Sequence, residues 1–174
     1  MKVLEYEARA LLAAGGMRIP AGHLVTTPEA ARAAAQRIGG PVVIKAQIPS
    51  GGRMKAGGVR FASSPEEASA IAGDLLGQPL LGHLVERALV EARLDICEEV
   101  FVGVTYDARA RRPIVLASRA GGIDVEAGQA LTQRAFSVLH TQPVPDYIRR
   151  EVAAELGFAG QPLLRLAAVI RAYL

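Results

Sequence analysis

The fold is decided by a stretch that begins Pro41-Val-Val-Ile-Lys-Ala-Gln47 and continues as Pro49-Ser-Gly-Gly-Arg-Met-Lys-Ala-Gly-Gly58. The first part is apolar up to its lysine, which predicts a buried strand, and the second predicts a glycine-rich loop. Val59–Ala62 then returns as a second strand. Glycines let a backbone turn its amides toward a phosphate, and Lys45 and Arg53 can neutralise phosphate charge. This is not a Walker A loop, and residue types alone equally allow a glycine-rich hairpin with solvated basic side chains.

Helices and strands are predicted on both sides of this stretch. The expected helices are residues 3–14, a helix from the capping sequence Thr26-Thr-Pro-Glu29 to Ile38, one from Ser64-Pro-Glu-Glu67 to Leu76, residues 147–156 capped by Asp146, and Leu163–Tyr173. The further expected strands are His23–Thr26, Leu84–Glu91, Glu99–Tyr106 and Pro113–Ser118. Residues 129–144 are weakly patterned. Early interleaving of helices and strands, followed by consecutive strands, predicts a mixed α+β (α/β) domain.

Composition excludes several classes of protein. Of the 174 residues, 51% are hydrophobic, which excludes a disordered chain, and no apolar run is long enough for a membrane helix. The single cysteine, Cys97, indicates a reducing compartment, so a cytoplasmic location is expected. There is no Cys/His spacing for zinc. A net charge of +3 is too small to predict nucleic-acid binding. Only three of the 20 basic residues are lysines, and two of them, Lys45 and Lys55, fall within eleven residues in the most glycine-rich stretch of the chain.

Two glutamates lie near adjoining strand ends, Glu91 after Leu89-Val and Glu99 at the start of the next strand. Acids placed there can accept hydrogen bonds from an adenine amino group or from ribose hydroxyls. The alternative is two acids beside a surface turn, which is the usual place for acids.

Several motifs together resemble one family. In order and spacing they resemble the N-terminal ATP-grasp domain of the β subunit of succinyl-CoA synthetase, a pattern shared by malate-CoA ligase and the N-terminal part of ATP-citrate lyase. The motifs are Glu5-Tyr6-Glu-Ala-Arg-Ala-Leu-Leu, Val43-Ile-Lys45-Ala-Gln47, Gly51-Gly-Arg-Met-Lys-Ala-Gly-Gly58, Leu89-Val-Glu91, Asp95-Ile96, Glu99, and Ala117-Ser118 with Gly121-Gly122-Ile-Asp-Val-Glu126. The resemblance covers nearly the whole chain.

The resemblance implies an ATP-grasp fold over residues 1–174, with mixed sheets, flanking helices and approximate lobes of residues 21–99 and of residues 1–20 plus 100–174. It also implies a set of nucleotide-binding residues. Lys45 would contact phosphate, and Gly52, Arg53 and Met54 would form the loop over the nucleotide. Glu91 would lie at the hinge near adenine, Glu99 would hold the ribose, and Leu94 is a further expected nucleotide-binding residue. His23, His83 and His140 match no catalytic position.

The resemblance further implies an ADP-forming acid-CoA ligase. In that family ATP phosphorylates a histidine of a separate α subunit, which also carries the CoA site. The expected cofactors are ATP and Mg²⁺, and the family's Mg²⁺ ligands follow the helix that matches Leu163–Leu174, so they are expected outside this chain. Activity by this chain alone is therefore not expected. The apolar last helix suggests a partner surface or a homodimer. The acid and the choice between ATP and GTP cannot be read from these residues.

Four positions depart from the family pattern. Met54 replaces a glycine, Pro49 replaces a histidine, and Glu98 replaces a lysine, which is expected to weaken polyphosphate binding. Arg119-Ala120 stands where a polar residue and a glutamate are usual. Three interpretations therefore remain open. The chain is a piece of a longer ligase β subunit, or a diverged short module that binds nucleotide without catalysis or serves only as a protein-interaction domain, or part of a different ATP-grasp enzyme, such as an ADP-forming acyl-CoA synthetase of another acid.

Overall fold

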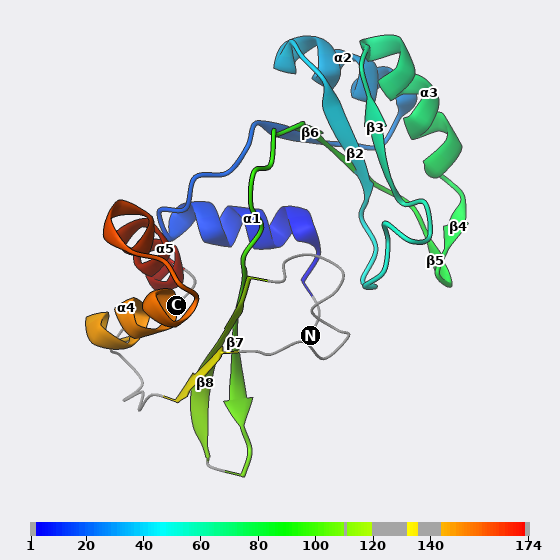
Figure 1. Cartoon of the computed structure of the whole chain (residues 1–174). Helices are drawn as coiled ribbons and strands as arrows, with labels where there is room; N and C mark the ends of the chain where they lie inside the picture. The colour runs from blue at the N-terminus through cyan, green and yellow to red at the C-terminus, as the bar shows by residue number, and fades with distance from the viewer. Residues whose placement is uncertain (1–2, 110, 120–131, 136–143, 173–174) are drawn as a thin grey trace. The chain divides into compact units, whose positions relative to one another are not determined.

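The computed structural model describes residues 3–109, 111–119, 132–135 and 144–172 (Figure 1). These divide into two compact units, Met1–Ala13 with Arg18–Asp95, and Ala14–Met17 with Ile96–Leu174. The mixed α+β fold expected from the sequence is confirmed. The approximate lobes placed residues 1–20 with residues 100–174, whereas residues 1–13 group with the first unit.

The first unit is built on an antiparallel four-stranded sheet in the order β1-β6-β2-β3 (Figure 1). Its strands are β1 (Gly22–Val25), β2 (Val42–Ala46), β3 (Val59–Ala62) and β6 (Ala88–Ala92). Its helices are α1 (Glu5–Ala14), α2 (Pro28–Ile38) and α3 (Pro65–Leu75). β2 and β3 are the two strands predicted on either side of the glycine-rich loop, and they pair directly.

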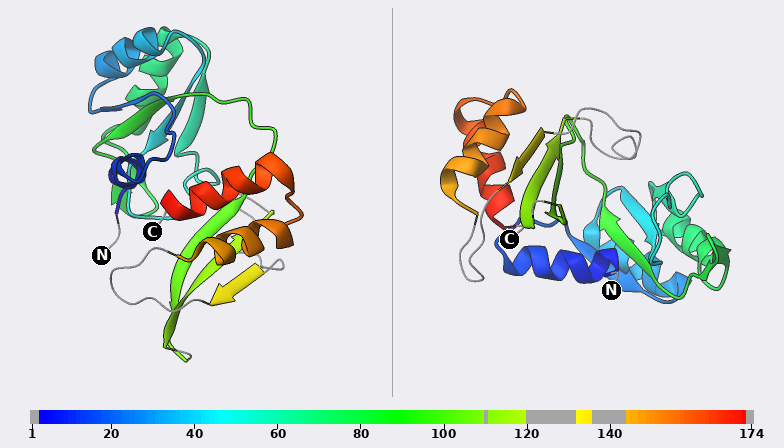
Figure 2. Two further views of the ribbon diagram at one scale, coloured as in Figure 1. Left: turned by 90° about the vertical axis from the view of Figure 1, so that its left-hand side faces the viewer. Right: turned by 90° about the horizontal axis from the view of Figure 1, so that it is seen from below.

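The core of the first unit lies on one face of this sheet, against α2 and α3 (Figure 2). Alternate residues of β2, namely Val42, Ile44 and Ala46, point into this core. Small residues of the helices, such as Ala31 and Ala68, are fully buried, which lets both helices lie close to the strands. The intervening β2 residues, including Lys45, therefore face the opposite side of the sheet.

Side-chain caps begin two of these helices. Ser64 accepts a hydrogen bond from the Glu67 amide at 3.1 Å, as predicted. α2 is capped by Thr27, which accepts from the Ala30 amide at 3.1 Å, and not by Thr26 as the sequence spacing suggested. The start of the helix decides between the two threonines, because Thr27 directly precedes the first helical residue, Pro28, and so occupies the N-cap position.

A two-stranded hairpin, β4 (Pro79–Leu80) and β5 (His83–Leu84), precedes β6. Its turn residues Leu81 and Gly82 have φ of 50° and 79°, the left-handed conformation typical of a tight two-residue turn. The single strand predicted over Leu84–Glu91 is therefore wrong at its start, because β6 begins only at Ala88. A β-carbon at Gly58 would lie 2.4 Å from Cδ2 of Leu80, so any side chain at this position would force Leu80 to shift.

The second unit is a three-stranded antiparallel sheet, β7-β8-β9, covered on one face by two helices (Figure 2). The elements are β7 (Phe101–Asp107), β8 (Arg112–Ser118), β9 (Thr132–Ala135), α4 (Asp146–Glu155) and α5 (Gly160–Ala172). Val115, Ile148, Val152 and Ile170 lie in its core. β9 falls in the weakly patterned stretch and was not predicted. Asp146 does not cap α4: it is the first helical residue and pairs with Arg149 and Arg150.

Cys97 is exposed in the segment between β6 and β7. Gly121–Glu126 and His140 lie outside the described residues. In the described part of the chain, every helix is too short or too polar to cross a membrane.

Candidate functional site: a charge cluster beside the glycine-rich loop

The strand register brings Lys45 and Glu91 together on one face of the sheet. Glu91 of β6 lies opposite Val43 of β2, two residues from Lys45, so both side chains project from the side away from the core. Lys45 Nζ lies 2.5 Å from Oε2 of Glu91. Glu91 is only 6% exposed, and this pairing compensates the cost of burying its charge.

Helix α1 adds a second carboxylate and a second cation to this face. Glu5 and Arg9 are four residues apart, so they lie on the same side of the helix. Glu5 Oε1 accepts from Lys45 Nζ at 2.9 Å, and Arg9 forms an ion pair with Oε1 of Glu91. Arg9 also donates to the carbonyl of Pro20. A β-carbon at Gly22 would come within 2.9 Å of the Arg9 guanidinium, so glycine at that position leaves room for it.

Buried Gln47 fixes the beginning of α1 to the end of β2. Its Oε1 accepts from the Tyr6 amide at 3.1 Å, and its Nε2 donates to the Lys45 carbonyl at 3.0 Å. The helix that carries Glu5 and Arg9 is therefore attached to the strand that carries Lys45 by a contact independent of the ion pairs.

The glycine-rich loop brings Arg53 to the carboxylate of Glu5. Arg53 Nη1 donates to the Ala46 carbonyl at 2.7 Å, and Nη2 donates to Oε2 of Glu5 at 2.6 Å. Internal hydrogen bonds shape the loop: the Gly58 amide donates to the Arg53 carbonyl at 2.7 Å and the Ala56 amide to the Gly52 carbonyl at 3.1 Å. The loop is thus a folded structure that holds one arginine in place.

We call Glu5, Arg9, Lys45, Arg53 and Glu91 the charge cluster. It contains three cations and two carboxylates, so it carries one net positive charge. Burial alone would raise the pKa of Glu5, but Lys45 and Arg53 outweigh it and hold that pKa below its ordinary value of 4.5. Burial alone would lower the pKa of Lys45, but Glu91 and Glu5 hold it above its ordinary value of 10.5. Both shifts keep Glu5 and Lys45 charged at neutral pH.

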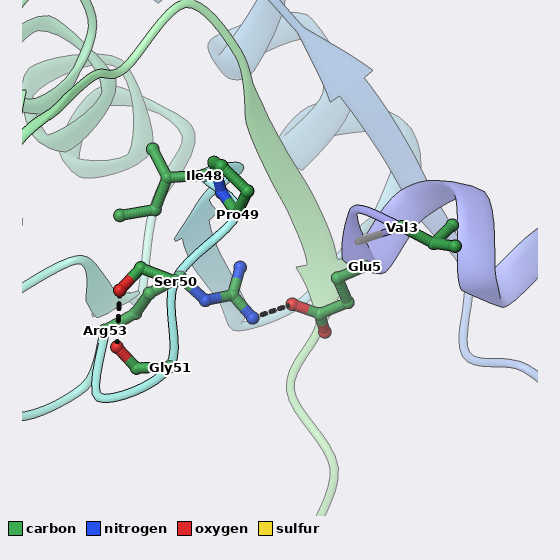
Figure 3. Close-up of a pocket in the computed structure, with 7 residues that line it drawn as sticks. All are labelled: Val3, Glu5, Ile48, Pro49, Ser50, Gly51 and Arg53. Carbon is green, nitrogen blue, oxygen red and sulfur yellow. Dashed lines mark hydrogen bonds and ion pairs between the residues drawn. The ribbon is translucent and has the colours of Figure 1, made fainter. Parts of the chain in front are cut away.

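A cavity of about 360 Å³ opens beside the charge cluster (Figure 3). Glu5 and Arg53, joined by their ion pair, line one part of it, and the residues from Ile48 to Gly51 line another. Pro49, one of the departures from the family pattern, lines this cavity. The arrangement provides cationic donors next to open space, which suits the binding of an anionic group.

The predicted site residues occupy different environments. Lys45, Arg53 and Glu91 meet in the charge cluster, and Gly52 lies in the loop with a φ of 72°. Met54 is exposed at the loop surface, and Leu94 is exposed after β6. Glu99 is exposed in the second unit. Both carboxylate oxygens of Glu91 are paired, Oε1 with Arg9 and Oε2 with Lys45. These two ion pairs were not part of the role expected for Glu91 beside adenine.

Glu5, Arg9 and Gln47 were not predicted as site residues, although all three lie inside the quoted motifs. The available signal was the four-residue spacing of Glu5 and Arg9 on an amphipathic helix, which places an acid and a base on one face. The spacing does not reveal which residues this face of the helix contacts, because its partners Lys45 and Glu91 are distant in the sequence.

Two departures from the family pattern contact each other in the second unit. Glu98 accepts from Nε of Arg119 at 2.8 Å and also pairs with its Nη2. Arg119 in turn donates to the Leu156 carbonyl at 3.2 Å, and its guanidinium carbon lies 4.8 Å from the Phe158 ring centroid. Glu98 was expected as an added negative charge, but Arg119 neutralises it locally.

The histidines and acids of the described residues form no evident metal site. His23 is half-buried in β1, and His83 is exposed in β5. In the parts of the chain that the structure describes, no group of three or more His, Cys, Asp or Glu side chains could hold a metal ion.

Fold and charge cluster together define a class of protein. The family model described as ATP-grasp domain matches residues 2–173, and the chain belongs to this family. Its curated relatives include β subunits of ADP-forming succinate–CoA ligase, which confirms the resemblance stated above. The subunit of Rubrobacter xylanophilus is 40% identical over 164 residues, covering 92% of this chain and 43% of the relative. That of Methanothermobacter thermautotrophicus is 35% identical over 173 residues, covering 98% and 47%. The chain thus spans less than half the length of these relatives.

Solved structures share the fold. A protein from Pyrococcus horikoshii Ot3 superposes with a TM-score of 0.75 at 25% identity, covering 98% of this chain and 74% of that one. The dinucleotide-forming acetyl-coenzyme A synthetase 1 of Ca. Korarchaeum cryptofilum, in complex with coenzyme A and Ca-AMPCP, gives a TM-score of 0.77 at 23% identity, covering 98% and 78%. At that identity the second likeness concerns the fold alone.

Proposed function

We propose that this chain is the nucleotide-binding ATP-grasp part of an ADP-forming acid-CoA ligase of the succinate or malate type. Its membership of the ATP-grasp family supports nucleotide binding. The observation that carries the proposal is the convergence of Lys45, from β2, and Arg53, from the following loop, on one anionic group beside a cavity. Two cations held in this way are suited to polyphosphate oxygens.

In this proposal Lys45 and Arg53 hold the phosphates, and Gly52 and Met54 belong to the loop over them. Glu91 and Leu94 lie near the base, and Glu99 accepts from the ribose hydroxyls. Because the described residues offer no group that fits a metal ion, we assign no Mg²⁺ ligand to them. Mg²⁺ would enter with the nucleotide and would neutralise phosphate charge during transfer.

The complete reaction needs a partner. We propose an α subunit as that partner, which is supported by the names of the relatives as β subunits. In this proposal the α subunit carries the CoA site and the histidine that is phosphorylated. The homodimer through the terminal helix stays a prediction, and exposed Leu164 and Val169 on α5 are the side chains available for either contact. A cytoplasmic location belongs to the same proposal.

The proposal is tested by thermal unfolding with ATP and ADP, each with and without Mg²⁺. We expect a saturable rise in Tm, equivalent to roughly 2.7 kcal/mol at a hundredfold excess over Kd. Lys45→Ala should weaken ATP binding by about tenfold or more, because it removes a charge-assisted contact to phosphate.

The matched control is Arg32→Ala, which also removes one positive charge but from the exposed pair of Arg32 and Glu66 on α2 and α3. Arg32→Ala should leave ATP affinity within about twofold. Equal losses in both variants would refute the assignment of Lys45 to phosphate. A wild-type chain that binds neither nucleotide would favour the second candidate, a protein-interaction module, in which the charge cluster only stabilises the first unit.

A further inference from the structure

The carboxylate of Glu5 occupies the donors that a phosphate group would need. Its two oxygens accept separately, Oε1 from Lys45 at 2.9 Å and Oε2 from Arg53 at 2.6 Å. We call these two donors, Lys45 Nζ and the Arg53 guanidinium, the phosphate subsite. Carboxylate and phosphate oxygens make the same kind of charge-assisted hydrogen bond, so the two anions compete for the same atoms.

Each of these two donors has a second partner besides Glu5. Arg53 is also bonded to the Ala46 carbonyl, and Lys45 is also paired with Glu91. Helix α1 is attached to the rest of the first unit by contacts that do not involve Glu5, including those from the Tyr6 amide to Gln47 and from Arg9 to Glu91. The Glu5 side chain can therefore rotate away while α1, Lys45 and Arg53 keep their other partners.

The surroundings leave room for that exchange. Glu5 lies in the first turn of α1, its side chain is 26% exposed, and it lines the cavity of about 360 Å³ together with Arg53 (Figure 3). An incoming anion can reach Arg53 from the cavity, and the displaced carboxylate can turn into the same solvent-connected space.

We propose that Glu5 is a built-in counter-anion of the phosphate subsite, which polyphosphate must displace from Lys45 and Arg53 before it binds. This inference rests on the proposed function, because it takes these two cations as the phosphate ligands. Glu5 thereby lowers the affinity for polyphosphate and keeps the empty subsite from holding stray anions. The lowered pKa of Glu5 is consistent with this role, since it keeps the carboxylate charged at neutral pH.

The test measures by calorimetry how tightly inorganic triphosphate and ATP bind. Three proteins are compared: the wild-type chain, the Glu5→Gln variant and the Glu29→Gln variant. Glu5→Gln removes the competing charge and keeps the size of the side chain. Glu29→Gln removes the same charge from an exposed position in the first turn of α2. We expect Glu5→Gln to bind both ligands about tenfold more tightly than the wild type, and Glu29→Gln to match the wild type within about twofold.

The two ligands separate this inference from the proposed function. If the Glu5→Gln variant binds triphosphate more tightly than the wild type, but ATP binds no better than triphosphate, the counter-anion role of Glu5 is supported. The proposed nucleotide-binding function is then overturned. If the wild type binds ATP well but the Glu5→Gln variant binds both ligands no more tightly than the wild type, the counter-anion role of Glu5 is overturned and the proposed function stands. If neither ligand binds any variant, both are overturned.

A second measurement needs no substitution at Glu5, and so remains decisive if that variant folds poorly. Carboxyl carbon NMR of the wild-type chain follows the titration of Glu5 with and without triphosphate. Displacement from Lys45 and Arg53 removes the charges that lower the Glu5 pKa and places phosphate nearby, so that pKa should rise on binding. An unchanged Glu5 pKa at saturating triphosphate would show that the carboxylate has not moved.

Discussion

At the scale of single residues, the charge cluster makes stability depend on pH at both extremes. Glu5 has its pKa lowered in the folded state, so its stabilising contribution is present above its ordinary value of 4.5 and is lost as the pH falls through the lower folded value. Lys45 has its pKa raised, so its contribution is present below 10.5 and is lost as the pH rises through the higher folded value.

We therefore expect Glu5→Gln to lower the free energy of unfolding by about 1 kcal/mol at pH 7, and the difference from the wild type to vanish in strong acid. Urea unfolding at pH 7 and at successively lower pH measures this. Glu29→Gln, which leaves the cluster intact, should show no comparable pH-dependent difference. A difference for Glu5→Gln that persisted unchanged into strong acid would contradict the ion pairs as its cause.

The sequence allowed part of this cluster to be predicted. Lys45 follows an apolar run and Arg53 lies among glycines, so local pattern was enough to mark both. The role of Glu5 depends on α1 lying against the open face of a sheet whose strands come from distant segments. Neither Lys45 nor Glu91 is close to Glu5 in the chain, and periodicity carries no information about such contacts.

At the scale of elements, the start of α2 provides a direct comparison of two neighbouring threonines. Thr27 caps the helix and Thr26 does not, although the spacing Thr26-Thr-Pro-Glu29 had suggested the earlier residue. Thr27→Ala should lower the free energy of unfolding by about 1 kcal/mol, because the Ala30 amide loses its acceptor. Thr26→Ala, the matched control, should cost no more than about 0.5 kcal/mol.

Urea unfolding of both variants measures this difference. Equal losses for the two threonines would contradict the assignment of the cap to Thr27. The same comparison explains why element boundaries were harder to predict than elements. Apolar spacing and capping signals identified the five helices that the structure describes. The exact cap depends on which residue begins the helix, and β9 and the hairpin of β4 and β5 carry too few apolar residues for a pattern to emerge.

At the scale of the whole molecule, the described chain contains two separate hydrophobic cores, one in each unit. Ile44 is buried in the first and Ile148 in the second. Replacing either by alanine removes the same atoms from a packed core, at a cost of about 3 kcal/mol in the unit concerned. Because each core belongs to one unit, we expect each change to act mainly on its own unit.

Native-state hydrogen exchange tests this expectation. Ile44→Ala should lower protection in β2 and β6 and leave β7 and β8 near the wild-type values, and Ile148→Ala should do the reverse. The two variants serve as controls for each other. If either substitution lowered protection equally throughout, the two units would unfold as a single cooperative block.

The exposed Cys97 has a practical consequence. It is the only thiol in the chain and lies in the segment between β6 and β7, next to Glu98 and two residues before Glu99. A maleimide dye would therefore attach at one defined position without any engineered cysteine. Its emission would sense the surroundings of the residue proposed to hold the ribose, so the unmodified sequence already supplies a fluorescent reporter for titration with nucleotide or with a partner subunit.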